Sequence, residues 1–129
     1  MKRQLFLTIA SIIAFCVGLF AIVFPNILLE SKGVEPFNGS IVWTRETGLL
    51  LLCIGIITFL IRKHETSATL KVFLFGNILI QVGLFAIELL AYFNNVITKL
   101  SGIIPNLTIH ILLAIGFFYF WNTINKKNN

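Results

Sequence analysis

Four long apolar segments constrain this chain more than any other feature of its sequence. They cover residues 5–24, 42–61, 70–93 and 105–124, and each ends just before a proline, an asparagine or a charged residue. A helix needs about 20 apolar residues to cross a hydrocarbon layer of about 30 Å. Uninterrupted apolar runs, such as residues 49–54, favour helices over alternating β-strands. The sequence therefore predicts an all-α fold: one transmembrane domain, residues 1–129, in which four helices form a bundle.

The composition supports a membrane environment. Of the 129 residues, 57% are apolar and only 12% are charged, whereas a soluble domain has about 45–50% and about 25%. A soluble domain of this size exposes a large share of its surface, and so few charges do not cover it. These values exclude a soluble enzyme, a disordered tail and a secreted disulfide scaffold, and they predict the lipid bilayer as the main partner.

The segment boundaries carry their own signals. The first segment stops at Pro25, and residues 25–41 are predicted to form the longest connecting loop, with a turn at Asn38-Gly39. Pro105 is suited to the first turn of a helix, so the fourth helix is predicted to begin there. The apolar stretch of the first segment exceeds the roughly 7–15 residues of a signal peptide, which predicts a retained helix.

Basic residues predict the orientation. With four spans, one side carries Lys2, Arg3, Arg62, Lys63, Lys71, Lys126 and Lys127, and the other side carries Lys32, Arg45 and Lys99. Because cytoplasmic loops carry an excess of Lys and Arg, both termini are predicted to be cytoplasmic. Single and paired charges at span ends are typical of anchoring to anionic lipids, so no nucleic-acid partner is predicted.

A stripe of polar side chains runs along segment 70–93. It consists of Asn77, Gln81, Glu88, Tyr92 and Asn95. At 100° per residue these positions fall within a sector of about 60°. A polar group exposed to hydrocarbon costs several kcal/mol, so this stripe is predicted to be the buried face of the helix. Gly76 and Gly83 lie on a neighbouring face and predict the close approach of another helix.

Small residues mark the faces of the first two segments. The first segment has a seam of Ala10, Ala14, Gly18 and Ala21. In the second segment, Arg45 shares a sector of about 80° with Gly48 and Gly55, which predicts that Arg45 points into the bundle. Cys16 and Cys53 lie near the middle of their segments and are predicted to be packing residues. Two Cys and two His are too few for a usual metal set, so neither metal nor cofactor is predicted.

Ionisable residues from three segments lie at a similar predicted depth. Counting 1.5 Å per residue from the segment centres, Arg45 and Glu88 lie about 10 Å toward the outside and His110 about 7 Å. The three residues predict one polar site in the outer half of the bundle. The full set of candidate binding residues is Arg45, Glu88, His110, Gln81, Asn77 and Tyr92. Two interpretations stay open: a structural Arg45–Glu88 ion pair, and a site that handles a ligand or protons.

Several short motifs resemble those of DoxX-like proteins, which are small four-helix membrane proteins of bacteria. The resemblance comprises Pro25 after the first segment, Arg45-x-x-Gly48 with Gly55 in the second, and His110 followed by Gly116-Phe117 in the fourth. It implies the same four-helix architecture and a location in the bacterial plasma or inner membrane. Some DoxX-like proteins are associated with quinol-oxidising or thiol-stress systems.

Two classes of function remain open at this point. The first is a structural or accessory membrane component, which packs against a partner subunit or a second copy of itself. The second is a protein that binds a lipid, a quinone or another small molecule, or passes protons, through the polar site. Glu88 and His110 are an acid–base combination, but no nucleophile, metal set or phosphate loop accompanies them. The sequence therefore predicts no catalytic residues and favours a non-enzymatic role without deciding it.

Overall fold

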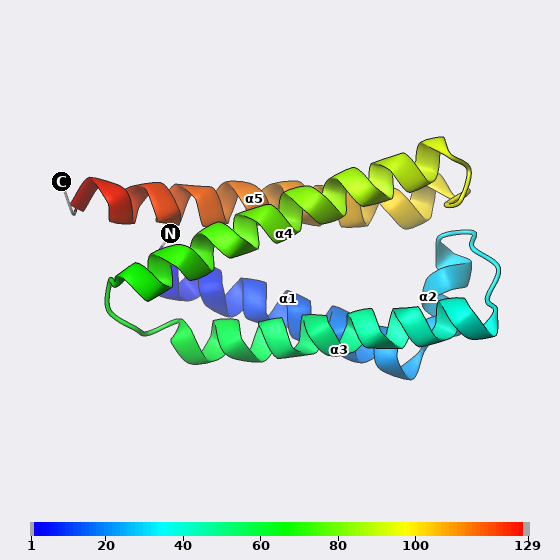
Figure 1. Ribbon diagram of the computed structural model, residues 1–129, viewed down its shortest axis with the longest axis horizontal. Coiled ribbons are helices and arrows are strands. Elements are labelled where there is room, and N and C mark those ends of the chain that lie inside the picture. The colour runs from blue at the N-terminus through cyan, green and yellow to red at the C-terminus, as the bar shows by residue number, and fades with distance from the viewer. Residues whose placement is uncertain (1, 128–129) are drawn as a thin grey trace. The chain divides into compact units, whose positions relative to one another are not determined.

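The computed structural model describes residues 2–127, with side chains through Ile124, and this part of the chain is all-helical. Its helices are α1 (Arg3–Val23), α2 (Pro25–Ser31), α3 (Asn38–Ile61), α4 (Ala68–Phe93) and α5 (Leu100–Lys127), shown in Figure 1. Four of them, α1, α3, α4 and α5, are long and apolar enough to cross a membrane. The predicted helical class and the four apolar helices are therefore confirmed.

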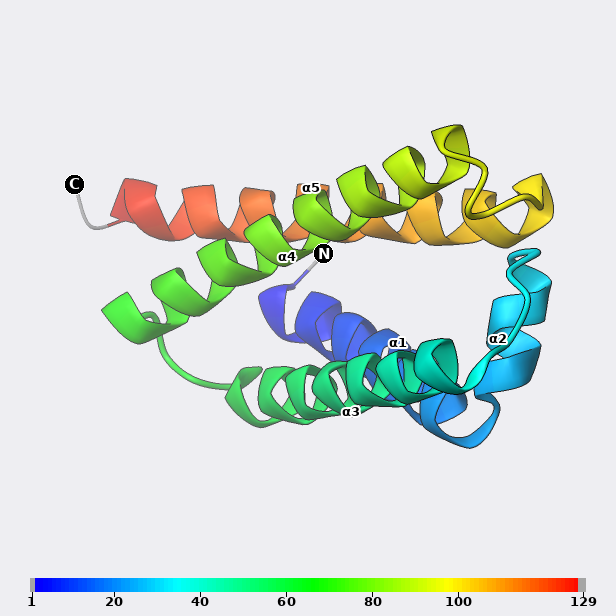
Figure 2. The same ribbon diagram turned by 45° about the vertical axis from the view of Figure 1, so that its right-hand side comes forward.

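The chain divides into two compact units, residues 1–63 and residues 64–129. In the N-terminal unit, α1 and α3 run side by side in opposite directions, and the short α2 runs across them at one end (Figures 1 and 2). In the C-terminal unit, α4 packs against α5, which runs in the opposite direction. Each unit is thus built around one antiparallel pair of long helices.

Glycines bring α1 and α3 together at the level of their backbones. A Cβ atom added to Gly18 would lie 2.6 Å from both the Gly48 oxygen and the Leu52 nitrogen. One added to Gly55 would lie 2.8 Å from the Phe15 nitrogen. Ala10, Gly18 and Ala21 are buried, which confirms most of the predicted seam, and Ser11 is buried beside them. The close packing of α1 and α3 therefore depends on residues without a side chain.

The predicted loop after Pro25 is wrong in part, because it contains the helix α2. Phe24 leaves the helical region, with φ −124° and ψ 51°, since a residue before proline is disfavoured there. Pro25 then occupies the first position of α2. Gly33 has φ 74° and donates to the Glu30 oxygen, while Val34 donates to the Leu29 oxygen. These two bonds form a Schellman motif that ends α2.

All four long helices begin earlier than predicted, and the differences are largest for α3 and α5. The hydroxyl of Ser40 accepts a hydrogen bond from the Phe37 N–H at 3.0 Å, and this cap allows α3 to begin at Asn38. Pro105 lies inside α5, not in its first turn. Proline removes a single helical bond at this position, the one to the Ser101 oxygen, so a helix that begins at Leu100 tolerates it.

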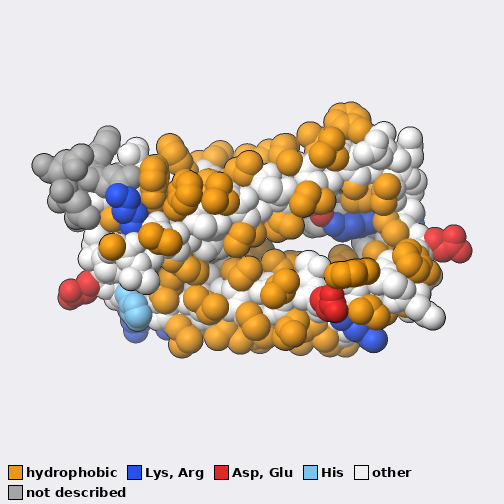
Figure 3. All heavy atoms as spheres, in the orientation of Figure 1, with side chains coloured by type: hydrophobic (Ala, Val, Ile, Leu, Met, Phe, Trp, Pro, Cys, Tyr) orange, Lys and Arg blue, Asp and Glu red, His pale blue; other side chains and the backbone are white. Residues whose placement is uncertain are grey.

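The C-terminal unit has an apolar core, and its apolar outer surface resembles that of a membrane helix pair. Leu74, Ile103 and Phe117 are almost completely buried. Many large apolar side chains remain exposed, among them Leu79 at 58% and Leu112 at 62%. Figure 3 shows apolar side chains along the helices, with charged groups gathered toward the helix ends. This distribution is the one expected of helices surrounded by lipid.

Candidate functional site

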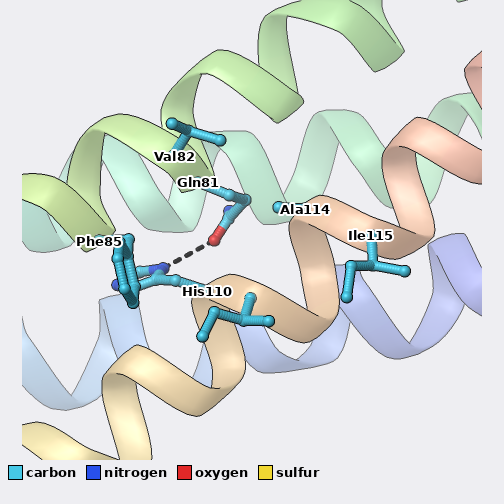
Figure 4. A pocket seen from close by; sticks show the side chains of 7 residues that line it. Gln81, Val82, Phe85, His110, Ala114 and Ile115 are labelled. Atoms are coloured by element: carbon cyan, nitrogen blue, oxygen red, sulfur yellow. Dashed lines mark hydrogen bonds between the residues drawn. The ribbon is translucent and has the colours of Figure 1, made fainter.

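A hydrogen bond between Gln81 and His110 joins α4 to α5 near the middle of α4. Gln81 Oε1 and His110 Nδ1 are 2.7 Å apart, and Figure 4 shows the two side chains pointing toward one another. Gln81 is only 8% exposed and His110 is half-buried. Because an amide oxygen can only accept a hydrogen bond, this arrangement requires a proton on His110 Nδ1. The bond is therefore consistent with an imidazole that carries hydrogen on Nδ1, and it links α4 to α5 at this level.

A second polar pair lies closer to the α4–α5 connection. Asn106 Nδ2 donates a hydrogen bond to Glu88 Oε1 at 2.9 Å, and both residues are half-buried. Glu88 Oε2 is buried as well. Glu88 follows Gln81 by seven residues on α4, and Asn106 precedes His110 by four on α5, so the antiparallel helices bring the two pairs onto one shared face. We call the Gln81–His110 and Glu88–Asn106 bonds the polar rungs.

Asn106 was not among the site residues predicted from the sequence. Its signal was present, because Asn106 lies one helical turn before His110 and therefore on the same face of α5. In antiparallel helices, moving forward along α4 corresponds to moving backward along α5. If Gln81 lies opposite His110, then Glu88, seven residues later, lies opposite residues 103–106 of α5. This register identifies Asn106 as a partner for Glu88.

Two other predicted site residues take no part in the polar rungs. Asn77 is buried, with 4% exposure, and its Nδ2 donates to the Phe73 oxygen of its own helix at 3.0 Å. Tyr92 is half-buried, and its ring centroid lies 6.2 Å from that of Phe93. The polar stripe is thus a buried face, as predicted at Asn77 and Gln81, but its members have separate partners.

Arg45 belongs to the N-terminal unit, where it is exposed near the start of α3. The glycines that share its sector, Gly48 and Gly55, are buried against α1. The face of α3 that contains Arg45 is therefore exposed at the start of the helix, and the same face packs against α1 farther along. The predicted meeting of Arg45 with Glu88 and His110 stays a prediction.

Two glycines of α4 and both cysteines do not make the contacts that were predicted for them. No described atom lies within 4 Å of a Cβ placed on Gly76 or Gly83, so α5 does not pack against that face of α4. Cys16 and Cys53 are exposed, so the expectation that they are packing residues is wrong. A free cysteine behaves as a small apolar side chain, so an exposed thiol on an apolar helix is tolerated in a lipid environment. The residues of the described part contain no group of three His, Cys, Asp or Glu side chains that would hold a metal ion.

A groove of about 160 Å³ lies beside the Gln81–His110 rung (Figure 4). Its two polar lining residues are Gln81 and His110 themselves. The remaining walls are apolar and come from both helices: Val82, Phe85, Ile111, Ala114 and Ile115. A concave apolar surface with a few convergent polar groups is the usual form of a small-molecule site.

Comparison with known proteins gives one family. The model of the family described as Domain of unknown function (DUF8292) matches residues 1–121, a range that includes all four apolar helices at least in large part and both polar rungs. No curated protein and no solved structure gives a significant match. The resemblance to DoxX-like proteins stays a prediction. Because the family match covers nearly the whole sequence, the chain belongs to the DUF8292 family.

Proposed function

We propose that the protein is a structural or accessory component of a membrane. One observation carries this proposal: the polar side chains of the candidate site form hydrogen bonds from one helix to the other. Gln81 and His110 bind one another at 2.7 Å, and Asn106 binds Glu88 at 2.9 Å. Such interhelical bonds stabilise membrane helix pairs by about 0.6 kcal/mol on average and about 1.7 kcal/mol at most.

The packing of the N-terminal unit agrees with a structural role. Close approach of α1 and α3 at Gly18, Gly48 and Gly55 is the usual way in which membrane helices associate. The polar rungs and the glycine contacts together give each unit a defined helix pair. We propose that the protein uses these pairs to associate with a partner subunit or with a second copy of itself.

We also propose that both termini face the cytoplasm and that the protein lies in the plasma or inner membrane of a bacterium. The excess of Lys and Arg on the side of the termini supports this orientation. The DoxX-like motifs around Arg45 and His110 support a bacterial membrane protein of four helices. In this orientation, the α2 helix and the α4–α5 connection face the outside.

Reporter fusions test the orientation. A phosphatase that is active only outside the cytoplasm should be active when inserted after Asn38 and inactive when fused after residue 127. A fluorescent protein that matures only in the cytoplasm should give the opposite pattern at the same two positions. The reversed pattern in both reporters would contradict the proposed orientation.

Removing one polar rung as a pair tests the structural role. Because Gln81→Leu together with His110→Leu removes both members of this bond, neither side chain of the pair is left facing a lost partner, and the free energy of unfolding should fall by no more than about 1.7 kcal/mol. We expect native mass spectrometry of gently solubilised native membranes to show the same defined complex, homo-oligomeric or with a partner, for this variant and the wild type. The matched control Ala86→Leu changes an exposed position on α4.

Two results would argue against a structural component. One is a wild-type chain that is extracted only as a monomer. The other is a double variant that assembles normally but fails to complement a deletion strain, since that result requires a chemical role for Gln81 or His110.

A second candidate function is the binding of a lipid, a quinone or another small molecule. The groove beside Gln81 and His110 favours it, because its apolar walls and two polar residues match the composition of small-molecule sites. A ligand that copurifies with the wild-type protein, and is lost from a variant with a filled groove, would support this function. An Ala114→Leu variant that retains all copurified small molecules would contradict it.

A further inference from the structure

Gln81 presents an unused hydrogen-bond donor at the groove. The side chain is more than nine-tenths buried and lines the groove. Its Oε1 pairs with His110 Nδ1, and within residues 2–127 the structure gives its Nε2 no hydrogen bond. An amide nitrogen carries two N–H donors and has no acceptor capacity. A molecule in the groove that accepts from Nε2 would gain about 0.5–1.5 kcal/mol, the usual net contribution of one hydrogen bond.

The walls of the groove restrict the rest of such a molecule. Val82, Phe85, Ile111 and Ile115 offer only apolar contacts. A charged molecule would lose its hydration there without an opposite charge in compensation. The volume of about 160 Å³ is close to that of an engineered apolar cavity, about 150 Å³, which accommodates benzene. The groove therefore fits one neutral ring or a short branched chain.

The position of Gln81 along the helix restricts the ligand further. Gln81 lies near the midpoint of the 26-residue helix α4. If α4 spans the bilayer, the ester groups of phospholipids lie at the interface, about 15 Å from this level. They do not reach Gln81. The acceptor must therefore belong to a molecule that carries its oxygen into the hydrocarbon layer.

From these three observations we propose that the groove binds a neutral apolar molecule of about ring size with a carbonyl oxygen that accepts from Gln81 Nε2. The proposal rests on the second candidate function, ligand binding, and names its chemistry. The carbonyl oxygen supplies the acceptor that the amide lacks, and the ring or chain fills the space between Val82, Ile111 and Ile115. The Gln81–His110 bond holds the amide in the orientation that directs Nε2 away from the imidazole.

Glutamine labelling makes this proposal directly testable, because Gln4 and Gln81 are the only glutamines in the chain. Protein labelled with ¹⁵N at the glutamine side chains is reconstituted in lipid nanodiscs and titrated with acetophenone. A parallel titration uses ethylbenzene, which has a similar size and no oxygen. We expect a saturable downfield shift of the Gln81 amide protons with acetophenone, and about fivefold weaker binding of ethylbenzene because one hydrogen bond is missing. Gln4, exposed near the start of α1, serves as the internal control.

Two alanine variants separate the groove from general effects of the probes. Ala114 lines the groove, and Ala114→Leu should reduce the affinity for acetophenone at least about tenfold, since it fills the space. Ala86→Leu adds the same volume on an exposed face of α4 and should leave the Gln81 shift unchanged. An unchanged shift in Ala114→Leu would overturn the assignment of the binding site.

The two titrations also distinguish failure of the proposal from failure of ligand binding itself. Equal saturable binding of acetophenone and ethylbenzene would leave the groove as an apolar site and overturn the role of the carbonyl oxygen. A Gln81 signal that responds to neither probe would overturn both the proposed carbonyl ligand and ligand binding at the groove. Either outcome is independent of the structural role, which the native complex tests separately.

Discussion

Replacing Gly18 by alanine is expected to destabilise the α1–α3 pair strongly. The added Cβ would lie 2.6 Å from the Gly48 oxygen and from the Leu52 nitrogen, and both are backbone atoms. A side chain in that position would be able to rotate away, but a backbone atom moves only with its helix. We expect a loss of about 1–3 kcal/mol in the free energy of unfolding, the usual cost of overpacking. Unfolding by a denaturing detergent, followed by circular dichroism, measures this loss.

Gly83→Ala is the matched control for this experiment. The same substitution is made on α4, where no described atom lies within 4 Å of the added Cβ. Since alanine favours helix by up to about 1 kcal/mol over glycine, this variant should be as stable as the wild type or slightly more stable. If Gly18→Ala and Gly83→Ala have equal stability, the backbone contact between α1 and α3 is not the one described.

Replacing Asn106 by aspartate is expected to break the Glu88–Asn106 rung without a change in size. Asn106 Nδ2 donates to Glu88 Oε1 at 2.9 Å, and aspartate puts an acceptor in its place. Acceptor oxygens of the new aspartate and of Glu88 would then face one another between the two helices, with no donor from Asn106 between them. We expect a loss of about 1–3 kcal/mol in the free energy of unfolding, the usual cost of leaving a buried polar group unsatisfied. Thermal unfolding in detergent gives the value.

Adding Glu88→Gln to Asn106→Asp should recover stability, since the glutamine amide then donates to the new aspartate and the direction of the hydrogen bond is reversed. Asn122→Asp, an exposed change on α5, is the control and should have little effect. A double variant that is less stable than Asn106→Asp alone would contradict the direct bond.

Apolar length and periodicity were sufficient to predict the long helices, and small residues identified the faces of α1 and α3 that make contact. The glycines at 18, 48 and 55 pack as predicted because close backbone approach leaves few alternatives to glycine. Gly76 and Gly83 have the same spacing but face away from α5. A glycine permits close contact, but it does not specify which helix makes that contact.

The candidate site was predictable only along α4, where the helical period places Gln81 and Glu88 on one face. Their partners depend on the antiparallel register of α5, which is set by the connection after α4. Asn95 adopts φ 58° there, and Val96 donates to the Ala91 oxygen at 2.9 Å. This left-handed turn lies where the chain reverses direction between α4 and α5, before the helix on which Asn106 meets Glu88. Sequence spacing alone gave neither the turn geometry nor the register.

The division into two helix pairs has a consequence for how the protein is made. The helix contacts that define the two pairs join α1 with α3 and α4 with α5. In each pair, the second helix begins a short distance after the first one ends. Contacts of this kind close short loops and form rapidly. Since chains fold from the N-terminus during synthesis, we expect α1 and α3 to pair while the ribosome is still translating α4. The N-terminal pair would then be complete before His110 is added to the chain.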